Sequence, residues 1–174
     1  CKGCYATTGM YNMPNVKAPR ISNKEDWKRK DWVDDMVNAI FNDELFRWFD
    51  SGDCYDLRLA KKIKQVIERT PTTKHWLPTR QHKFPKFTKV LTEIASLPNA
   101  VVRLSSDSIN GGIIKGDTTS TIWSTEPPKE AFECGAYTRN GECKDCRACW
   151  DKLVKVVAYP GHGAKMLKVI RLQG

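Results

Sequence analysis

Apolar residues recur every three or four positions in three stretches of the chain, a spacing typical of helices with one buried face. The three predicted helices cover residues 31–42, 57–69 and 85–96. Between and after them lie short runs rich in β-branched and aromatic residues, which favour strands. The four predicted strands cover residues 45–49, 74–80, 100–105 and 119–123. Helices and strands therefore alternate along the middle of the chain.

Strands that alternate with helices of about a dozen residues indicate βαβ units and a mainly parallel sheet. Right-handed crossovers then bring the C-terminal ends of all the strands to one edge. We predict an α/β fold, a partial or open βα barrel, in a single domain of 174 residues. Residues 1–22 form an N-terminal cysteine segment without regular structure, residues 23–125 the βα core, and residues 126–174 an irregular, cysteine-rich C-terminal segment.

Polar residues follow the predicted strands at this edge, where α/β proteins bind their ligands. We predict that Asp50, Ser51, Asp53 and Arg80 bind a cofactor or substrate. The aspartates would bind an amine, a hydroxyl or a metal of the ligand, and Arg80 would bind its carboxylate or phosphate. The sequence Asp-Ser-Gly-Asp is also typical of an ordinary turn or helix cap, so that interpretation stays open. Arginines inside the strands, among them Arg103, are expected to pair with the aspartates.

Four of the seven cysteines lie close together near the C-terminus. Cys143, Cys146 and Cys149 have the C-x2-C-x2-C spacing that opens the bacterial ferredoxin motif, and Cys134 offers a fourth thiolate. We predict that these four residues bind an iron–sulfur cluster, with 4Fe–4S as the first choice. Zinc also takes four cysteines, although structural zinc sites more often use two separate cysteine pairs, and zinc or no metal remain alternatives.

The other cysteines give weaker signals. Cys1 and Cys4 form a C-x2-C pair, which is predicted to ligate metal, either with cysteines upstream of this sequence or in a centre shared with the C-terminal group. Cys54 follows the acidic turn and is expected to be buried, with metal ligation or thiol reactivity as alternatives. An odd, uneven set of cysteines argues against a disulfide framework and for a reducing compartment.

The chain has a net charge of +9, from 29 Lys and Arg against 20 Asp and Glu. Such an excess is compatible with nucleic acid as a partner, but the basic residues are scattered and a solvated surface explains them better. No apolar run approaches the roughly 20 residues that a membrane-spanning helix needs, so no membrane partner is predicted.

Several motifs occur in one order along the chain: Cys1-x-x-Cys4-Tyr5-Ala6, Phe46-Arg47-Trp48-x-Asp50-Ser51-Gly52-Asp53, His75-Trp76-Leu77-Pro78-Thr79-Arg80 and Cys143-x-x-Cys146-Arg147-Ala148-Cys149-Trp150. Together they resemble the phage gene product 88 family over nearly the whole chain. The resemblance implies a phage origin, a location in the cytoplasm of the infected host cell, and an iron–sulfur protein. Family members have further residues, including a cysteine, before the first motif, and the resemblance therefore implies additional N-terminal ligands.

A more distant likeness is to radical SAM enzymes, which also place a cysteine motif near the first strand of a βα barrel. Their motif is C-x3-C-x2-C, and only its final C-x2-C matches here. By analogy the turn at residues 50–53 would hold the amino group of S-adenosylmethionine, although fold analogy does not establish function. The sequence thus predicts an iron–sulfur protein with a redox role and an unknown small-molecule or redox partner. The alternatives are a radical SAM-like enzyme and a zinc-stabilised nucleic-acid-binding protein.

Overall fold

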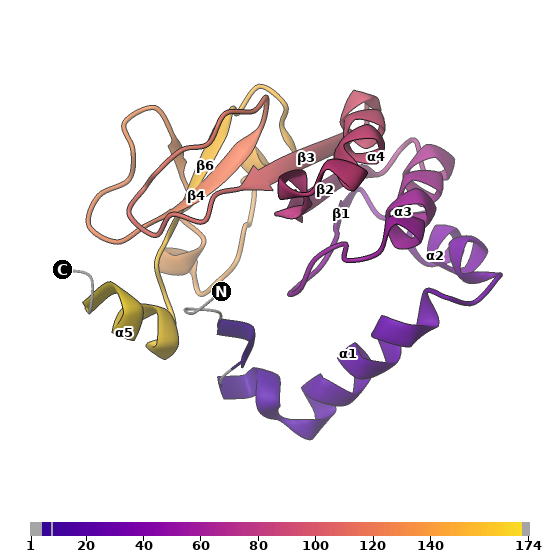
Figure 1. The fold of residues 1–174 in the computed structure, drawn as a ribbon, viewed down its shortest axis with the longest axis horizontal. Coiled ribbons are helices and arrows are strands. Elements are labelled where there is room, and N and C mark those ends of the chain that lie inside the picture. The colour runs from indigo at the N-terminus through magenta and orange to yellow at the C-terminus, as the bar shows by residue number, and fades with distance from the viewer. Residues whose placement is uncertain (1–4, 8, 172–174) are drawn as a thin grey trace.

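The structure, a computed structural model, describes residues 5–7 and 9–171 and contains a six-stranded, all-parallel sheet that curls as a half-barrel (Figure 1). The strand order is β1-β2-β3-β4-β6-β5. The strands are β1 (Leu45–Arg47), β2 (Lys74–Thr79), β3 (Ala100–Ser105), β4 (Thr119–Trp123), β5 (Phe132–Glu133) and β6 (Val156–Pro160). The helices are α1 (Pro14–Asp26), α2 (Trp32–Ile40), α3 (Leu57–Arg69), α4 (Pro85–Ser96) and α5 (Ala164–Arg171).

The predicted α/β fold is confirmed, and so are the three predicted helices and four predicted strands. The prediction of irregular structure over residues 1–22 is wrong from Pro14 onward, because α1 begins there with a proline in its first turn. None of the residues of α1 is buried, so this helix lacks the apolar face by which a sequence reveals a helix. Strand β6 and helix α5 also lie in a segment that was predicted to be irregular.

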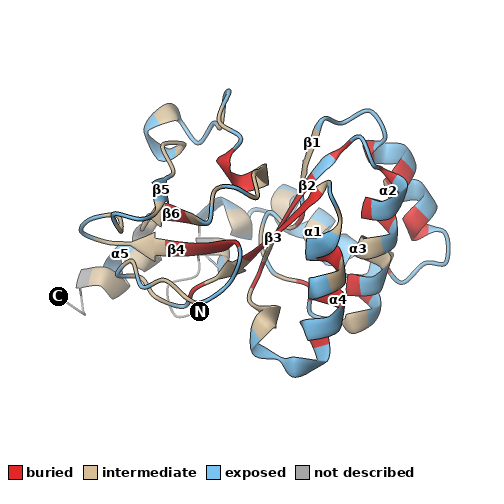
Figure 2. Cartoon of the chain, turned by 90° about the horizontal axis from the view of Figure 1, so that it is seen from above, coloured by how far each residue is buried: buried red, intermediate tan, exposed pale blue. Residues whose placement is uncertain are grey.

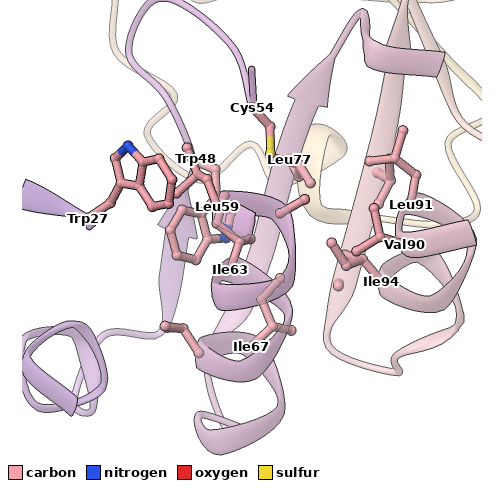
Figure 3. Close-up of a cluster of buried hydrophobic side chains, with 14 of the residues drawn as sticks. Trp27, Trp48, Cys54, Leu59, Ile63, Ile67, Leu77, Val90, Leu91 and Ile94 are labelled. Atoms are coloured by element: carbon pink, nitrogen blue, oxygen red, sulfur yellow. The ribbon is translucent and has the colours of Figure 1, made fainter. Parts of the chain in front are cut away.

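Helices α2, α3 and α4 cover one face of the sheet and form the larger core with it (Figures 1 and 3). Ile63 and Ile67 of α3 and Phe87 and Ile94 of α4 are completely buried there. Leu77 of the neighbouring strand β2 points into the same cluster (Figure 3). Burial of each such side chain contributes about 1.5–3 kcal/mol, so this cluster is the main apolar source of stability in the fold.

The opposite face of the sheet is covered by the cysteine-rich segment. Side chains alternate between the two faces of a strand, and in β2 Leu77 faces the helices while Trp76 packs with Ala148 and Cys149. Val157 of β6 joins the same small cluster. We call this side of the sheet the inner face. The buried residues of both faces are marked in red in Figure 2.

None of the described helices is both long and apolar enough to cross a membrane.

Candidate metal centre

The four C-terminal cysteines lie in a stretch of turns and short 3-10 helices between β5 and β6. Cys134 directly follows β5, and its backbone N–H donates to the carbonyl oxygen of Ala158 at 2.8 Å, which ties it to the end of the sheet. Cys143 and Cys146 flank a tight turn, closed by a 3.0 Å bond from the N–H of Cys146 to the carbonyl of Cys143. Cys149 lies in the 3-10 helix η5 (Ala148–Trp150), which packs on β2 and β3.

Three of these four cysteines share one apolar cluster on the inner face. Cys149 is 7 % exposed and packs in a cluster with Trp76 and Val157, while Cys134 and Cys146 are half-buried against it. The Sγ atom of Cys149 lies 3.2 Å from the hydroxyl of Tyr159, so one of the two groups can donate to the other. The segment therefore brings thiols from both of its ends to the same apolar surface.

The thiols also influence each other electrostatically. Burial raises the pKa of Cys149 to about 11, and charge on Cys134 and Cys143 raises it further, while Tyr159 and Arg103 oppose the shift. Burial likewise raises the pKa of Cys134, with smaller contributions from Cys143 and Cys146. Cys134 and Cys149 are therefore protonated at neutral pH unless a cation stabilises the thiolates, as a metal ion does.

Within residues 5–7 and 9–171, no three side chains of Cys, His, Asp or Glu are arranged closely enough to hold a metal ion. The donors fit a thiophilic metal in kind and number, because four cysteines are free and neighbouring. To bind one metal centre, the four thiols would have to move closer together. The backbone between Cys134 and Cys146 would have to change for this, and in that stretch Asn140, Gly141 and Lys144 have positive φ angles. Cys1 and Cys4 lie outside the described residues.

Arg103 is a residue of this region whose environment the sequence did not reveal. It was expected to pair with an aspartate, but its guanidinium instead donates five hydrogen bonds to backbone carbonyl oxygens. The acceptors are Ala148 at 2.6 Å, Val154 at 2.9 Å, Asp151 at 3.0 Å, Cys149 at 3.2 Å and Thr119 at 3.3 Å. Four of them belong to the segment that contains Cys149, so this arginine fastens the segment to the middle of the sheet.

At the C-terminal edge of the sheet, Asp53 and Arg80 lie together as the sequence predicts. The carboxylate of Asp53 accepts hydrogen bonds from the N–H of Cys54, the hydroxyl of Thr79 and the N–H of Arg80, each at 2.7 Å. The guanidinium of Arg80 donates to the carbonyl of Ser106 at 3.2 Å and lies 3.5 Å from Asp107. Asp53 and Arg80 thus link the ends of β1, β2 and β3.

The other two predicted binding residues lie on the same turn. The carboxylate of Asp50 accepts a 3.0 Å hydrogen bond from the hydroxyl of Tyr11, which brings the N-terminal segment to this edge. The buried hydroxyl oxygen of Ser51 has no hydrogen-bond partner among the described residues. Cys54, next along the chain, is fully buried in the helix-side core, where burial raises its pKa to about 12. Its predicted burial is confirmed.

Four lysines line a groove between α3 and α4 together with two glutamates: Lys61, Lys64, Lys86, Lys89, Glu68 and Glu93. Lys64 forms ion pairs with Glu93 at 3.0 Å and with Glu68 at 3.5 Å. The groove is therefore of mixed charge, and nucleic-acid binding stays a prediction from the net charge.

A family model, described as Gene product 88, matches residues 1–152. The chain belongs to the Gene product 88 family. The part that matches this family includes all seven cysteines and the polar residues at the sheet edge, and it ends before β6. No curated protein and no solved structure matches the chain significantly. Membership of the Gene product 88 family therefore confirms the resemblance found in the sequence, and the chemistry of the site has to be argued from its residues.

Replacing Asp53 by alanine is expected to lower the free energy of unfolding by about 3 kcal/mol, because three buried or half-buried donors lose their acceptor. Chemical denaturation measures this loss. The matched control is Asp50→Ala, which removes the exposed bond to Tyr11 and is expected to cost less than about 1 kcal/mol. Equal stability of the two variants would show that Asp53 does not brace the sheet edge and would favour a role in ligand binding alone.

Proposed function

We propose that this protein is an iron–sulfur protein with a redox role, whose cluster is held by Cys134, Cys143, Cys146 and Cys149. The observation that carries the proposal is that Cys134, Cys146 and Cys149 share one apolar cluster on the inner face of the sheet, with Cys143 close enough to act electrostatically on Cys134 and Cys149. A bound cluster would supply one-electron transfer. We place the protein in the cytoplasm of the infected host cell, where the reducing environment keeps such thiols free.

The residues around the cysteines suit this role. Trp76 and Val157 shield Cys149 from water, and the indole N–H of Trp150 donates to the carbonyl of Phe46 at 3.1 Å, which anchors the segment on β1. The indole nitrogen of Trp76 is buried without a hydrogen-bond partner among the described residues, so it is a free donor beside the cysteines. Hydrogen bonds to cluster sulfurs are one means by which proteins adjust reduction potentials.

The sheet edge is the second part of the proposal. Of the four predicted residues, Asp50, Ser51 and Arg80 would bind a small molecule or a redox partner there, and the unpartnered hydroxyl of Ser51 supports this assignment. Three protein donors already use the Asp53 carboxylate, so we assign it to shaping the edge, with Ser51 and the Arg80 guanidinium facing the ligand. Zinc held by the same four cysteines would instead give a purely structural centre.

Anaerobic purification followed by iron, sulfide and zinc analysis tests the proposal. We expect iron and sulfide in near-equal amounts in the wild-type protein and a loss of most of both in Cys146→Ser, which changes a half-buried thiol and leaves the core intact. Cys54→Ala is the matched control. Because Cys54 lies in the helix-side core, this variant is expected to leave the metal content unchanged. A wild-type protein that holds only zinc, or a Cys146→Ser variant with full iron content, would refute the proposed centre.

A further inference from the structure

We infer that Arg103 is a positioning residue for the proposed centre, which fixes the Cys149 segment and supplies the buried positive charge that balances the cysteine thiolates. This inference rests on the proposed function. It concerns a residue outside the cysteine motifs and outside the polar sheet edge. Because Arg103 belongs to β3, the sheet would then contribute a side chain to the centre.

The geometry sets Arg103 apart from a surface arginine. Its side chain is completely buried on the inner face, at the middle of β3. All three of its nitrogens donate, and the five acceptors are neutral backbone carbonyls rather than carboxylates. Among them is the carbonyl of Cys149 itself, at 3.2 Å from Nε. The guanidinium fork therefore determines where the backbone of this cysteine lies relative to the sheet.

Carbonyl dipoles satisfy the donors of a guanidinium but do not cancel its charge. A buried cation without a counter-ion is costly, and proteins usually pair it with an anion. None of the five acceptors of Arg103 is a carboxylate, and the ionisable groups that act on it are Tyr159, Cys149 and Asp151. A cluster or metal held by four thiolates has a net negative charge beside Arg103, and this charge would provide the missing balance.

Asp151 is the alternative counter-ion, and its contacts argue against that role. One carboxylate oxygen of Asp151 accepts the N–H of Leu153 at 2.8 Å, while Arg103 bonds to the backbone carbonyl of Asp151. The side chain of Asp151 thus stabilises the local turn. Of the remaining groups, Cys149 is the one that metal binding converts to a thiolate.

A fixed positive charge near a redox centre favours its reduced, more negative state. Arg103→Met removes the charge, and we expect the reduction equilibrium of the cluster to become at least tenfold less favourable, which is about 59 mV for a one-electron couple. Arg103→Lys retains the charge and is expected to keep a potential close to that of the wild type. Both potentials are measured on the reconstituted full chain by anaerobic titration with dithionite, beside circular dichroism as a check of the fold.

Two control variants separate charge balance from loop attachment. Lys152 belongs to the same segment and attaches it to the end of helix α4, because its Nζ donates to the carbonyl oxygens of Ala95 at 2.8 Å and Leu97 at 2.6 Å. Lys152→Met is therefore expected to loosen the segment without a shift of potential. Asp151→Asn is expected to leave the potential unchanged as well. A tenfold change of the equilibrium in Asp151→Asn, equal to that in Arg103→Met, would assign the charge balance to Asp151 and overturn the inference.

The result for Arg103 decides the rest. A loaded Arg103→Met protein with the wild-type potential would overturn the inference while the proposed function stands. If Arg103→Met does not fold, Arg103→Gln, which keeps a hydrogen-bond donor without the charge, takes its place: a tenfold shift then supports the role of the charge, and a wild-type potential overturns the inference. A wild-type protein that takes up no iron and sulfide would refute the proposed function itself, and this inference with it.

Discussion

Removal of the metal from the loaded protein is expected to release the cysteine-rich segment from the inner face while the helical half stays folded. The reason is the unequal size of the two cores. The cluster on the helix side contains 19 buried residues, whereas the cluster around Cys149 contains four. Thiols that prefer the protonated state add little attraction of their own, so under the proposed function the segment would depend on the bound metal and on Arg103. We expect the free energy that holds the segment on the sheet to fall by about 5 kcal/mol or more, since structural zinc sites contribute roughly 10–16 kcal/mol to folding.

Hydrogen exchange before and after chelation measures this release. The N–H of Cys134, bonded to Ala158, is expected to lose its protection, whereas the N–H of Ala60 at the start of α3, bonded to Asp56, keeps it. Cys54→Ala treated with the same chelator serves as a control for general thiol effects. Uniform loss of protection in both halves would mean that the domain unfolds as one unit, and unchanged protection of Cys134 would mean that the metal does not hold the segment.

The elements that the sequence predicted are those whose residues alternate between a buried and an exposed side. In α3, residues such as Ile63 and Ile67 recur at helical spacing because this helix must cover the sheet with one face. Helix α1 has no buried residue, and its local sequence therefore contains no such pattern. Strand β6 has a Val-Val pair that favours a strand, but its short length and Pro160 made the signal ambiguous.

The candidate site was predictable to the extent that it depends on spacing. The separation of Cys143, Cys146 and Cys149 indicates metal ligands in any fold, and the position of Asp53 after β1 places it at the sheet edge. The role of Arg103 was not predictable, because its five acceptors are backbone carbonyls, four of which lie 45 or more residues away in the chain. Every residue has a backbone carbonyl, so no sequence pattern shows which carbonyls will accept these hydrogen bonds.

The two faces of the sheet divide stability from chemistry. Leu77 and Val102 face the helices, where apolar packing holds the fold, while Trp76 and Arg103 on the same two strands face the cysteines. A change on the helix side should therefore alter stability without altering the arrangement of the cysteines. His75 is a titratable residue buried on that side, and it makes this stability depend on pH.

His75 is completely buried on the helix side and stacks on Trp48, with ring centres 6.0 Å apart. The hydroxyl of Thr70 donates to the carbonyl of Val66 at 2.8 Å, so the Nε2–H of His75 must donate to that hydroxyl, 2.9 Å away. The other ring nitrogen, Nδ1, is buried without a hydrogen-bond partner among the described residues. A proton on Nδ1 would therefore enter an apolar site, and burial lowers the pKa of His75 to about 4.

Acidification from pH 6.5 to pH 4 is expected to cost about 3 kcal/mol of stability through His75 alone. Its pKa is about 4 in the folded chain and about 6.5 in the unfolded chain, so the stability is complete above pH 6.5 and is lost as the unfolded state takes up the proton. Denaturation at a series of pH values measures how the free energy of unfolding changes with pH. The carboxylates contribute equally to the wild type and to His75→Phe, so the difference between the two proteins is the contribution of His75. His82→Gln is the matched control and should keep the full acid sensitivity. A His75→Phe variant with the wild-type slope would show that another group causes the loss.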